Sequence, residues 1–333
     1  MRFLLRRFVT LGCAAGLSVA STLGQSAGGG GDDLKVKPPS WAYPMGASTP
    51  LAVRKEDGKS LRAAGSNVSY TRAEIRDLMR VADWFPETHP AMPGIVAKGR
   101  APGVYACAYC HLPNGLGRPE NASIAGLPAE YIVQQVADFK SGARRSSELR
   151  FASVNYMIAI SHEVTADEVR IAAGYFSSLK ATPWIRVVEA DEVPKTRIAG
   201  MMLVLAESTG IEAIGQRVIE VPEDLEQTEL RNSSSGFVAY VPKGSLERGS
   251  ALVKTGGNGK TLACGMCHGA TLQGMGKVPS IAGRSPSQMA RQMIDIQNGV
   301  RNGAGVALMK PVVAQLTMDD IVAITGYLAF LKP

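Results

Sequence analysis

Two copies of one five-residue pattern contain every cysteine beyond the N-terminal region. Each copy reads C-x-x-C-H. Two thiols three residues apart on one helical turn can bond to both vinyl groups of a single porphyrin, and the imidazole that follows can bind its iron. The pattern therefore predicts covalent c-type haem attachment. The residues expected to carry it are Cys107, Cys110 and His111 in the first copy, and Cys264, Cys267 and His268 in the second.

A redox-active dithiol and a zinc ribbon also use cysteine pairs at this spacing. Neither requires a histidine directly after each pair, and both pairs here have one. The one remaining cysteine, Cys13, lies in the N-terminal region. Two complete patterns with no other cysteine left over favour two haems over either alternative.

The patterns belong to an internal repeat whose two copies lie 157 residues apart, the offset from Cys107 to Cys264. In each copy a Ser-Ile-Ala-Gly segment begins 13 residues after the second cysteine, at Ser123 and at Ser280. The same offset pairs Gln135 with Gln292, Asp138 with Asp295, and Arg144 with Arg301. One haem module therefore occurs twice in the chain.

The sixth iron ligand is predicted from the same repeat. Met157 is the only methionine between His111 and Gly200, and counting back from the C-terminal helices pairs it with Met309. A thioether is a soft ligand that favours ferrous iron and raises the reduction potential relative to a second histidine. The rivals in the second copy have no counterpart in the first; these are Met275, Met289, Met293 and Met318.

Two further histidines could replace a methionine as ligand. They are His89 and His162, and neither has a counterpart in the second copy. We therefore expect both to be packing or surface residues.

The repeat divides the chain into five segments. Residues 1–25 show the basic, apolar and small-residue order of an export signal, which predicts a periplasmic protein; a signal that is not cleaved would instead hold the protein peripherally at the membrane. Residues 26–86 form an N-terminal extension, residues 87–182 the first haem domain, residues 183–243 a β-rich linker, and residues 244–333 the second haem domain. In the extension, Thr71 and Glu74 predict a capping box that opens a helix reaching about Phe85.

The predicted fold is mainly α, with two haem domains in tandem and a small β-rich insert between them. Each domain is expected to contain a short helix before its C-x-x-C-H pattern, a middle helix, a loop that carries the methionine, and a last helix. The middle helices span 128–141 and 286–298, and the last helices 166–180 and 318–332. The insert is too small for a core of its own, so it serves either as a clasp on the haem domains or as a docking surface.

Charge and hydropathy exclude two classes of protein. Without the three arginines of the export signal, 33 basic residues face 29 acidic ones, a net charge of +4 instead of +7. No basic cluster with interleaved aromatic residues remains, which argues against nucleic-acid binding. Beyond the N-terminus there is no apolar run of about 18 residues, which argues against a multi-span membrane protein.

Together these motifs resemble the tandem dihaem class I cytochromes c, the cytochrome c4 group. The resemblance covers residues 93–182 and 246–333, and it includes the C-x-x-C-H patterns, the Ser-Ile-Ala-Gly turns and the Gln-x-x-Asp middle helices. It implies that a backbone carbonyl, often that of a proline, orients each haem histidine; Pro279 fits this role, and Ala122 stands at the matching place. Family members usually have a short linker, so the insert leaves the relative placement of the two haems open.

The resemblance implies electron transfer and no catalysis. With a histidine and a methionine on each iron, no coordination position is open to oxygen or peroxide. The expected partners are an electron donor and an electron acceptor, such as a dehydrogenase or a terminal oxidase. One alternative is a subunit that serves a single such enzyme. A dihaem peroxidase is another, and it would need one open iron and a nearby acid/base group.

Overall fold

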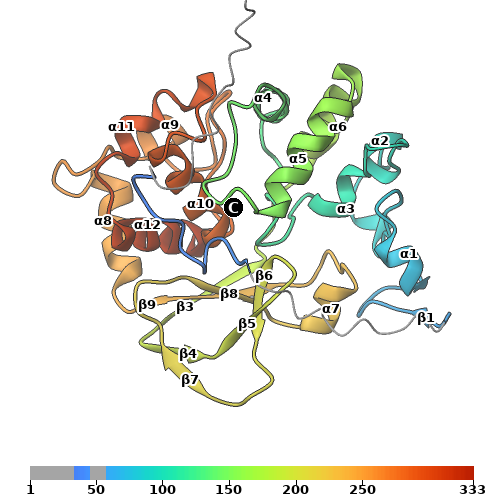
Figure 1. Ribbon diagram of the computed structural model, residues 1–333, viewed down its shortest axis with the longest axis horizontal. Helices are drawn as coiled ribbons and strands as arrows, with labels where there is room; N and C mark the ends of the chain where they lie inside the picture. The colour runs from blue at the N-terminus through green and yellow to red at the C-terminus, as the bar shows by residue number, and fades with distance from the viewer. Residues whose placement is uncertain (1–33, 46–57) are drawn as a thin grey trace, which may run out of the picture. The chain divides into compact units, whose positions relative to one another are not determined.

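The helices of the two repeats lie above a group of short strands in the view of Figure 1. The computed structural model describes residues 34–45 and 58–333, so the expected export signal at residues 1–25 lies outside the described residues. No helix in these two ranges is long and apolar enough to span a membrane.

The second repeat contains α8 to α12. The helix α8 (Ser245–Thr255) packs against α12 (Met318–Phe330), and α10 (Pro286–Gln297) packs against another side of α12. Two short helices, α9 (Gly265–His268) and α11 (Met309–Val313), complete the repeat. Strands cover a further side of α12, which explains why its ten residues from Asp320 to Ala329 are all buried.

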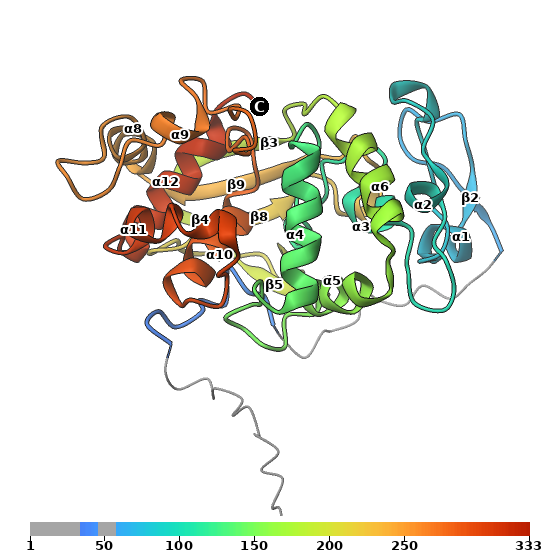
Figure 2. The same ribbon diagram turned by 90° about the horizontal axis from the view of Figure 1, so that it is seen from above.

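The first repeat follows the same order. It contains α2 (Gly94–Ala97), α3 (Cys107–His111), α4 (Ala129–Ser141), α5 (Ala152–Glu163) and α6 (Ala166–Ser178). Figure 2 shows α4 between the helices of the second repeat and the rest of the first. The last helices α6 and α12 both begin with a capping box, formed by Thr165 with Glu168 and by Thr317 with Asp320.

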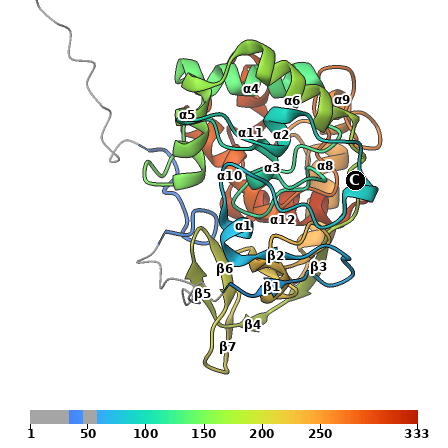
Figure 3. The same ribbon diagram turned by 90° about the vertical axis from the view of Figure 1, so that its right-hand side faces the viewer.

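Seven strands lie between the repeats in sequence, along the side of the helices seen at the bottom of Figure 3. Strand β9 (Phe237–Pro242) is central, parallel to β3 (Ile185–Ala190) and antiparallel to β8 (Ile219–Pro222). Two hairpin-like pairs join β4 (Glu192–Pro194) to β7 (Ile211–Ala213), and β5 (Thr196–Ala199) to β6 (Met202–Leu205). A short helix, α7 (Leu225–Glu229), precedes β9.

These strands contribute side chains to the hydrophobic cores of both repeats. Because side chains alternate along a strand, Met202 and Val204 of β6 pack in the core of the first repeat while Leu203 packs in that of the second. Phe237 and Val238 of β9 divide in the same way. The strands thus hold the two repeats against each other, as a clasp would.

The N-terminal extension differs from the expected long helix. It contains β1 (Ser60–Leu61), β2 (Tyr70–Thr71), α1 (Arg72–Arg76) and a 3-10 turn at Pro86–Thr88. The capping box of Thr71 and Glu74 is confirmed, but the prediction that the helix reaches Phe85 is wrong. Instead, the backbone oxygens of Leu78 and Met79 accept hydrogen bonds from Ala106 and Gly99 of the first repeat, at 3.0 and 2.8 Å. Tertiary pairing therefore replaces the helical bonds after Arg76.

The contact between α8 and α12 depends on a residue without a side chain. A methyl group at Gly249 of α8 would lie 2.6 Å from Cβ of Tyr327 and closer still to the backbone oxygen of Ala323. Gly174 of α6 is also helical, but a methyl group there would meet nothing within 4 Å.

We predict opposite effects of alanine at these two glycines. Gly249→Ala should lower the free energy of unfolding by about 1–3 kcal/mol, because the methyl group forces two helices apart. Gly174→Ala should leave it unchanged or raise it by up to about 1 kcal/mol through helix propensity. Urea unfolding followed by circular dichroism measures the free energy of unfolding of both variants. Equal effects of the two substitutions would contradict the close approach of α8 to α12 at Gly249.

Candidate functional site

The two C-x-x-C-H patterns adopt the same single helical turn. The first forms α3, and the second forms α9 with Cys264 as its N-terminal cap, so that the His268 N–H donates to the Cys264 oxygen at 2.9 Å. In each copy the residue after the histidine has a positive φ, 62° at Leu112 and 80° at Gly269. The chain therefore turns sharply away from each histidine.

Each histidine is fixed by a carbonyl from the turn that follows. Nδ1 of His111 lies 2.8 Å from the Ala122 oxygen, and Nδ1 of His268 lies 2.8 Å from the Pro279 oxygen. A carbonyl can only accept, so Nδ1 carries the proton and Nε2 presents its lone pair. Burial lowers the pKa of both imidazoles, which keeps them neutral. The expected carbonyl partners are confirmed, and alanine serves as well as proline.

The loops around the histidines repeat bond for bond. The His111 oxygen accepts a hydrogen bond from the Gly117 N–H at 2.9 Å, and the His268 oxygen accepts one from the Gly274 N–H at 2.9 Å. The donors of these two bonds lie 157 residues apart, and so do their acceptors. Added side chains at these glycines would collide with the backbone of the same turn that orients the histidine. The glycines therefore permit the close approach on which the histidine–carbonyl bond depends.

The four cysteines are unpaired and sheltered to different degrees. Burial raises the pKa of Cys107 to about 12 and that of Cys264 to about 11. A redox dithiol or a zinc site needs thiolates, which form where the pKa is lowered. Cys107 and Cys264 thus lack the lowered pKa that marks the activated thiolate of a redox dithiol.

The two predicted methionine ligands occupy different structures. Met157 lies inside α5, where no glycine or proline interrupts the helix, so the prediction of a methionine loop is wrong for the first repeat. Met309 is the first residue of α11, after a stretch that contains Gly303 and Gly305. Met309 packs against the same hydrophobic cluster as Cys264, whereas Met157 is not part of the cluster that contains Cys107. Both methionines therefore remain predicted ligands.

The other two histidines occupy sites outside the patterns. Nε2 of His89 lies 3.2 Å from a carboxylate oxygen of Asp83, and its Nδ1 lies 3.1 Å from the hydroxyl of Tyr175. His162 is exposed near the end of α5.

Polar residues that recur in both repeats meet where the repeats touch. Arg144 donates to Gln135 and to Gln292, at 2.9 Å each. Arg301 donates to Gln135 at 3.1 Å and to the hydroxyl of Tyr131 at 3.0 Å. Sequence reasoning had found these recurring residues without a role for them. The recurrence of the glutamine in each middle helix and of the arginine after it was the available signal.

Backbone bonds and one further arginine strengthen this contact. The Arg145 N–H donates to Val300 at 2.9 Å, and the Asn302 N–H donates to Ala143 at 2.6 Å. Arg284 of the second repeat donates to the Ser123 and Ala125 oxygens of the first, at 2.9 and 3.0 Å. These two residues follow Ala122, whose carbonyl binds His111, by one and three positions.

The arginines at this contact have no carboxylate among their hydrogen-bond partners, although the charges of Asp295 and Asp138 act on Arg144. Arg284 and Arg301 are buried, and the hydrogen bonds that they and Arg144 make go to neutral groups. The Nε atoms of Arg284 and Arg301 have no hydrogen-bond partner, and burial together with the charge of Arg301 lowers the pKa of Arg144 to about 10. Buried cations are costly unless an anion neutralises them. A haem carries two propionate groups, so this donor set fits two haems held near the contact.

Comparison with known proteins gives three informative relatives. A thiosulfate dehydrogenase electron acceptor from Thiomonas intermedia (strain K12) is 25% identical over 231 residues, which cover 68% of this chain and 79% of that protein. Cytochrome c4 from Azotobacter vinelandii is 34% identical over 83 residues, covering 21% of this chain and 40% of that protein. Cytochrome c-554(548) from Halomonas halodenitrificans (strain ATCC 12084 / NCIMB 8669) is 32% identical over 72 residues, covering 21% of this chain and 87% of that protein. No family model matches the chain.

We predict that Gln135 is needed for the contact between repeats. Gln135→Leu should lower the free energy of unfolding by about 2–4 kcal/mol, because it removes the acceptor shared by two guanidinium groups. Gln315→Leu, at an exposed position, is the matched control and should change it by less than about 0.5 kcal/mol. Chemical denaturation of both variants measures the free energy of unfolding. Similar losses in the two variants would show that the acceptor shared by the two arginines does not stabilise the contact.

Proposed function

The chain belongs to the cytochrome c4-like dihaem class I cytochromes c, and on that premise we propose that it carries electrons between redox proteins in the periplasm. The observation that carries the proposal is the matched pair of neutral, carbonyl-bonded histidines that directly follow the cysteine pairs. In this arrangement residues 87–182 and 244–333 are the haem domains, residues 183–243 an insert with strands, and residues 26–86 an extension that follows an export signal at 1–25.

The protein side of the two sites follows from the geometry. The cysteines of each pattern would hold one porphyrin through two thioethers, and Nε2 of His111 and of His268 would bind the irons. Met157 and Met309 would each supply a second ligand to one of the irons. When bound, each haem supplies an iron that takes up and releases one electron. The hydrogen bond at each Nδ1 keeps the imidazole in one orientation and tautomer in both oxidation states.

A carrier needs little structural change when its charge changes. A histidine and a methionine on each iron would keep water and substrates from the metal, and the buried arginines at the contact between repeats could balance the propionates. An enzyme of the dihaem peroxidase type would require one open iron instead. Carbon monoxide distinguishes the two, because it binds only where a coordination position is free.

A more specific role is supported by the relative that matches most of the chain. That relative is named as the electron acceptor of thiosulfate dehydrogenase, and the similarity extends over 68% of this chain and so beyond a single haem domain. We propose that this chain likewise accepts electrons from a dedicated dehydrogenase, with thiosulfate dehydrogenase as the first candidate.

We predict that removing a methionine sulfur opens one iron. Met157→Leu and Met309→Leu keep the side-chain volume but remove the ligand, so each variant should bind carbon monoxide at one of two haems and lose part of the far-red band typical of methionine ligation. Met293→Leu is the control and should behave like the wild type. Optical spectra of the oxidised and reduced protein, with and without carbon monoxide, measure both effects. Binding of carbon monoxide by the wild-type protein would contradict the proposal that it is an electron carrier.

We also predict that thiosulfate dehydrogenase with thiosulfate reduces the protein. When the oxidised protein is mixed with the dehydrogenase and thiosulfate, both haems should become reduced. No reduction should occur when thiosulfate is left out. Stopped-flow spectroscopy at the haem bands measures the rate. If dithionite reduces both haems but the dehydrogenase does not, the protein can still be an electron carrier, but thiosulfate dehydrogenase is not its donor.

A further inference from the structure

The outer faces of the two C-x-x-C-H patterns have different surroundings. The middle residues of each pattern point away from the side where its cysteines and histidine would hold a porphyrin. In the first pattern these residues are buried, with Tyr109 only 8% exposed. In the second, Met266 stands at the position of Tyr109 and is 69% exposed. Since both patterns have the same backbone, neighbouring segments must account for the difference.

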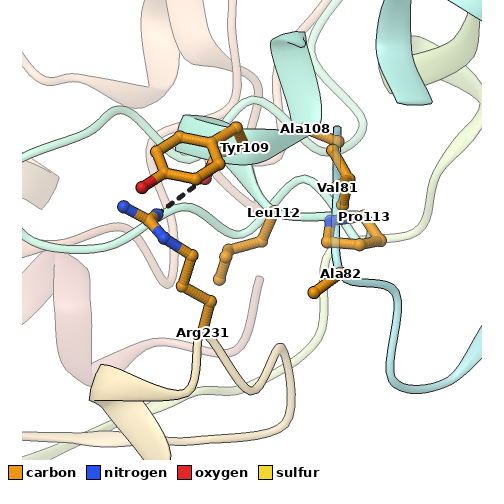
Figure 4. A pocket seen from close by; sticks show the side chains of 7 residues that line it. All are labelled: Val81, Ala82, Ala108, Tyr109, Leu112, Pro113 and Arg231. Atoms are coloured by element: carbon orange, nitrogen blue, oxygen red, sulfur yellow. Dashed lines mark hydrogen bonds between the residues drawn. The ribbon is translucent and has the colours of Figure 1, made fainter. Parts of the chain in front are cut away.

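The first pattern is covered by residues 228–233, which we call the cap segment. Figure 4 shows the guanidinium group of Arg231 over the ring of Tyr109; its carbon lies 3.6 Å from the ring centre, and its Nη1 donates to the Tyr109 oxygen at 2.8 Å. Val81 and Ala82 of the extension close the other side. The cavity left between them has a volume of about 10 Å³, room for about one water molecule.

The cap segment is attached to its surroundings at four points. The oxygens of Thr228 and Ser233 accept from Arg118 and Asn114 in the loop after the first pattern, at 3.3 and 2.6 Å. The oxygen of Leu230 accepts from the indole of Trp84 at 2.7 Å. Arg231 supplies the fourth attachment, to Tyr109. The first pattern is therefore closed by the fold and not by a chance side-chain position.

The backbone conformation of Arg231 is unfavourable for a residue with a side chain. Arg231 follows the end of α7 with a φ of 56°, the left-handed conformation that glycine adopts at this place in most helices. A residue with a side chain costs stability there. The stacking and hydrogen bond on Tyr109 offset that cost.

The second pattern presents an open apolar surface. Leu262 and Met275, four residues before and nine residues after Met266, are also exposed, as is Leu308 beside the predicted ligand Met309. The Thr261 hydroxyl donates to the Val312 oxygen at 2.7 Å, which places α11 beside the loop before the pattern. We call Leu262, Met266, Met275 and Leu308 the open surface. Methionines are adaptable at binding surfaces because their side chains are flexible and polarizable.

Basic residues predominate around the open surface, although Lys277, two residues after Met275, pairs with Glu130 of α4 at 2.7 Å. From residue 248 to residue 318 the only acidic residue is Asp295, which is buried. Lys254 and Lys310 are exposed in the same stretch, and the Cys264 N–H donates to Val253 at 2.9 Å, which holds the end of α8 beside the pattern. An apolar centre with mainly basic residues around it suits an acidic protein.

We propose that an acidic redox protein docks on the open surface of the second haem domain, and that the cap segment closes the first domain to such docking. This inference rests on the proposed function and identifies its partner surface. Electrons would enter and leave through the second domain and reach the first only within the protein.

The docking is tested with flavodoxin, an acidic one-electron donor, and the full-length haem-loaded protein. Reduction by flavodoxin hydroquinone should be fast at low salt and slow down as salt is added. Met266→Glu should slow it by roughly fivefold or more at low salt. The control is Ile211→Glu on β7, at a position that is 62% exposed; it should change the rate by less than about twofold. Equal effects of the two substitutions would overturn the proposal.

A second readout requires no electron transfer. Hydroxyl-radical labelling should oxidise Met266 and Met275 in the free protein, and oxidised flavodoxin should protect them. Protection that arises from raising the protein concentration alone would assign the surface to a second copy of this chain and overturn the proposal. Loss of docking with both haems still reducible by dithionite and closed to carbon monoxide would leave the proposed function intact.

The cap is tested by nitration of tyrosine with tetranitromethane and mass spectrometry. Tyr156, which is exposed, should be nitrated in the wild type while Tyr109 is not. Arg231→Gly suits the backbone at that position, so the fold should be kept and nitration of Tyr109 should rise severalfold. Nitration of Tyr109 in the wild type at the rate of Tyr156 would show that the first domain is not closed.

Discussion

The hydrogen-bonded contact between the two repeats is the constraint on which the rest of the structure depends. Gln135 accepts from an arginine of each repeat, and the backbones of the two copies pair directly beside it. This contact fixes α4 against the second repeat and brings Arg284 to the turn that orients His111. The strands then need only to bind to both cores at once, and the single-residue alternation along β6 achieves this.

The contact also concentrates positive charge where little water can reach it. Arginines with neutral partners and orphaned Nε atoms are an unfavourable arrangement for the chain alone. They become favourable when anionic groups lie among them, which links folding of the contact to the cofactors that the cysteine patterns would attach. The haem sites and the contact between repeats are in this sense one structural unit.

Duplication has given the chain two matching sites in unlike surroundings. The histidines, their carbonyl partners and the glycine turns recur almost unchanged, because each is required for holding an iron ligand. The outer faces are free of that requirement and have diverged. The first is covered by the cap segment and the extension, and the second remains open with basic residues near it. Equivalent sites can thus have different roles, one internal and one external.

The sequence by itself determined the chemistry and the local elements of the haem domains. The C-x-x-C-H turns and the middle and last helices depend on neighbours in the chain, so pattern and propensity were sufficient for them, and the family resemblance added the histidine carbonyls. Only the tertiary structure decided the end of α1, where bonds from Gly99 and Ala106 replace helical ones. It also decided the helical setting of Met157 and the stacking of Arg231 on Tyr109. These features join residues far apart in the chain, and no periodicity or short motif records such contacts.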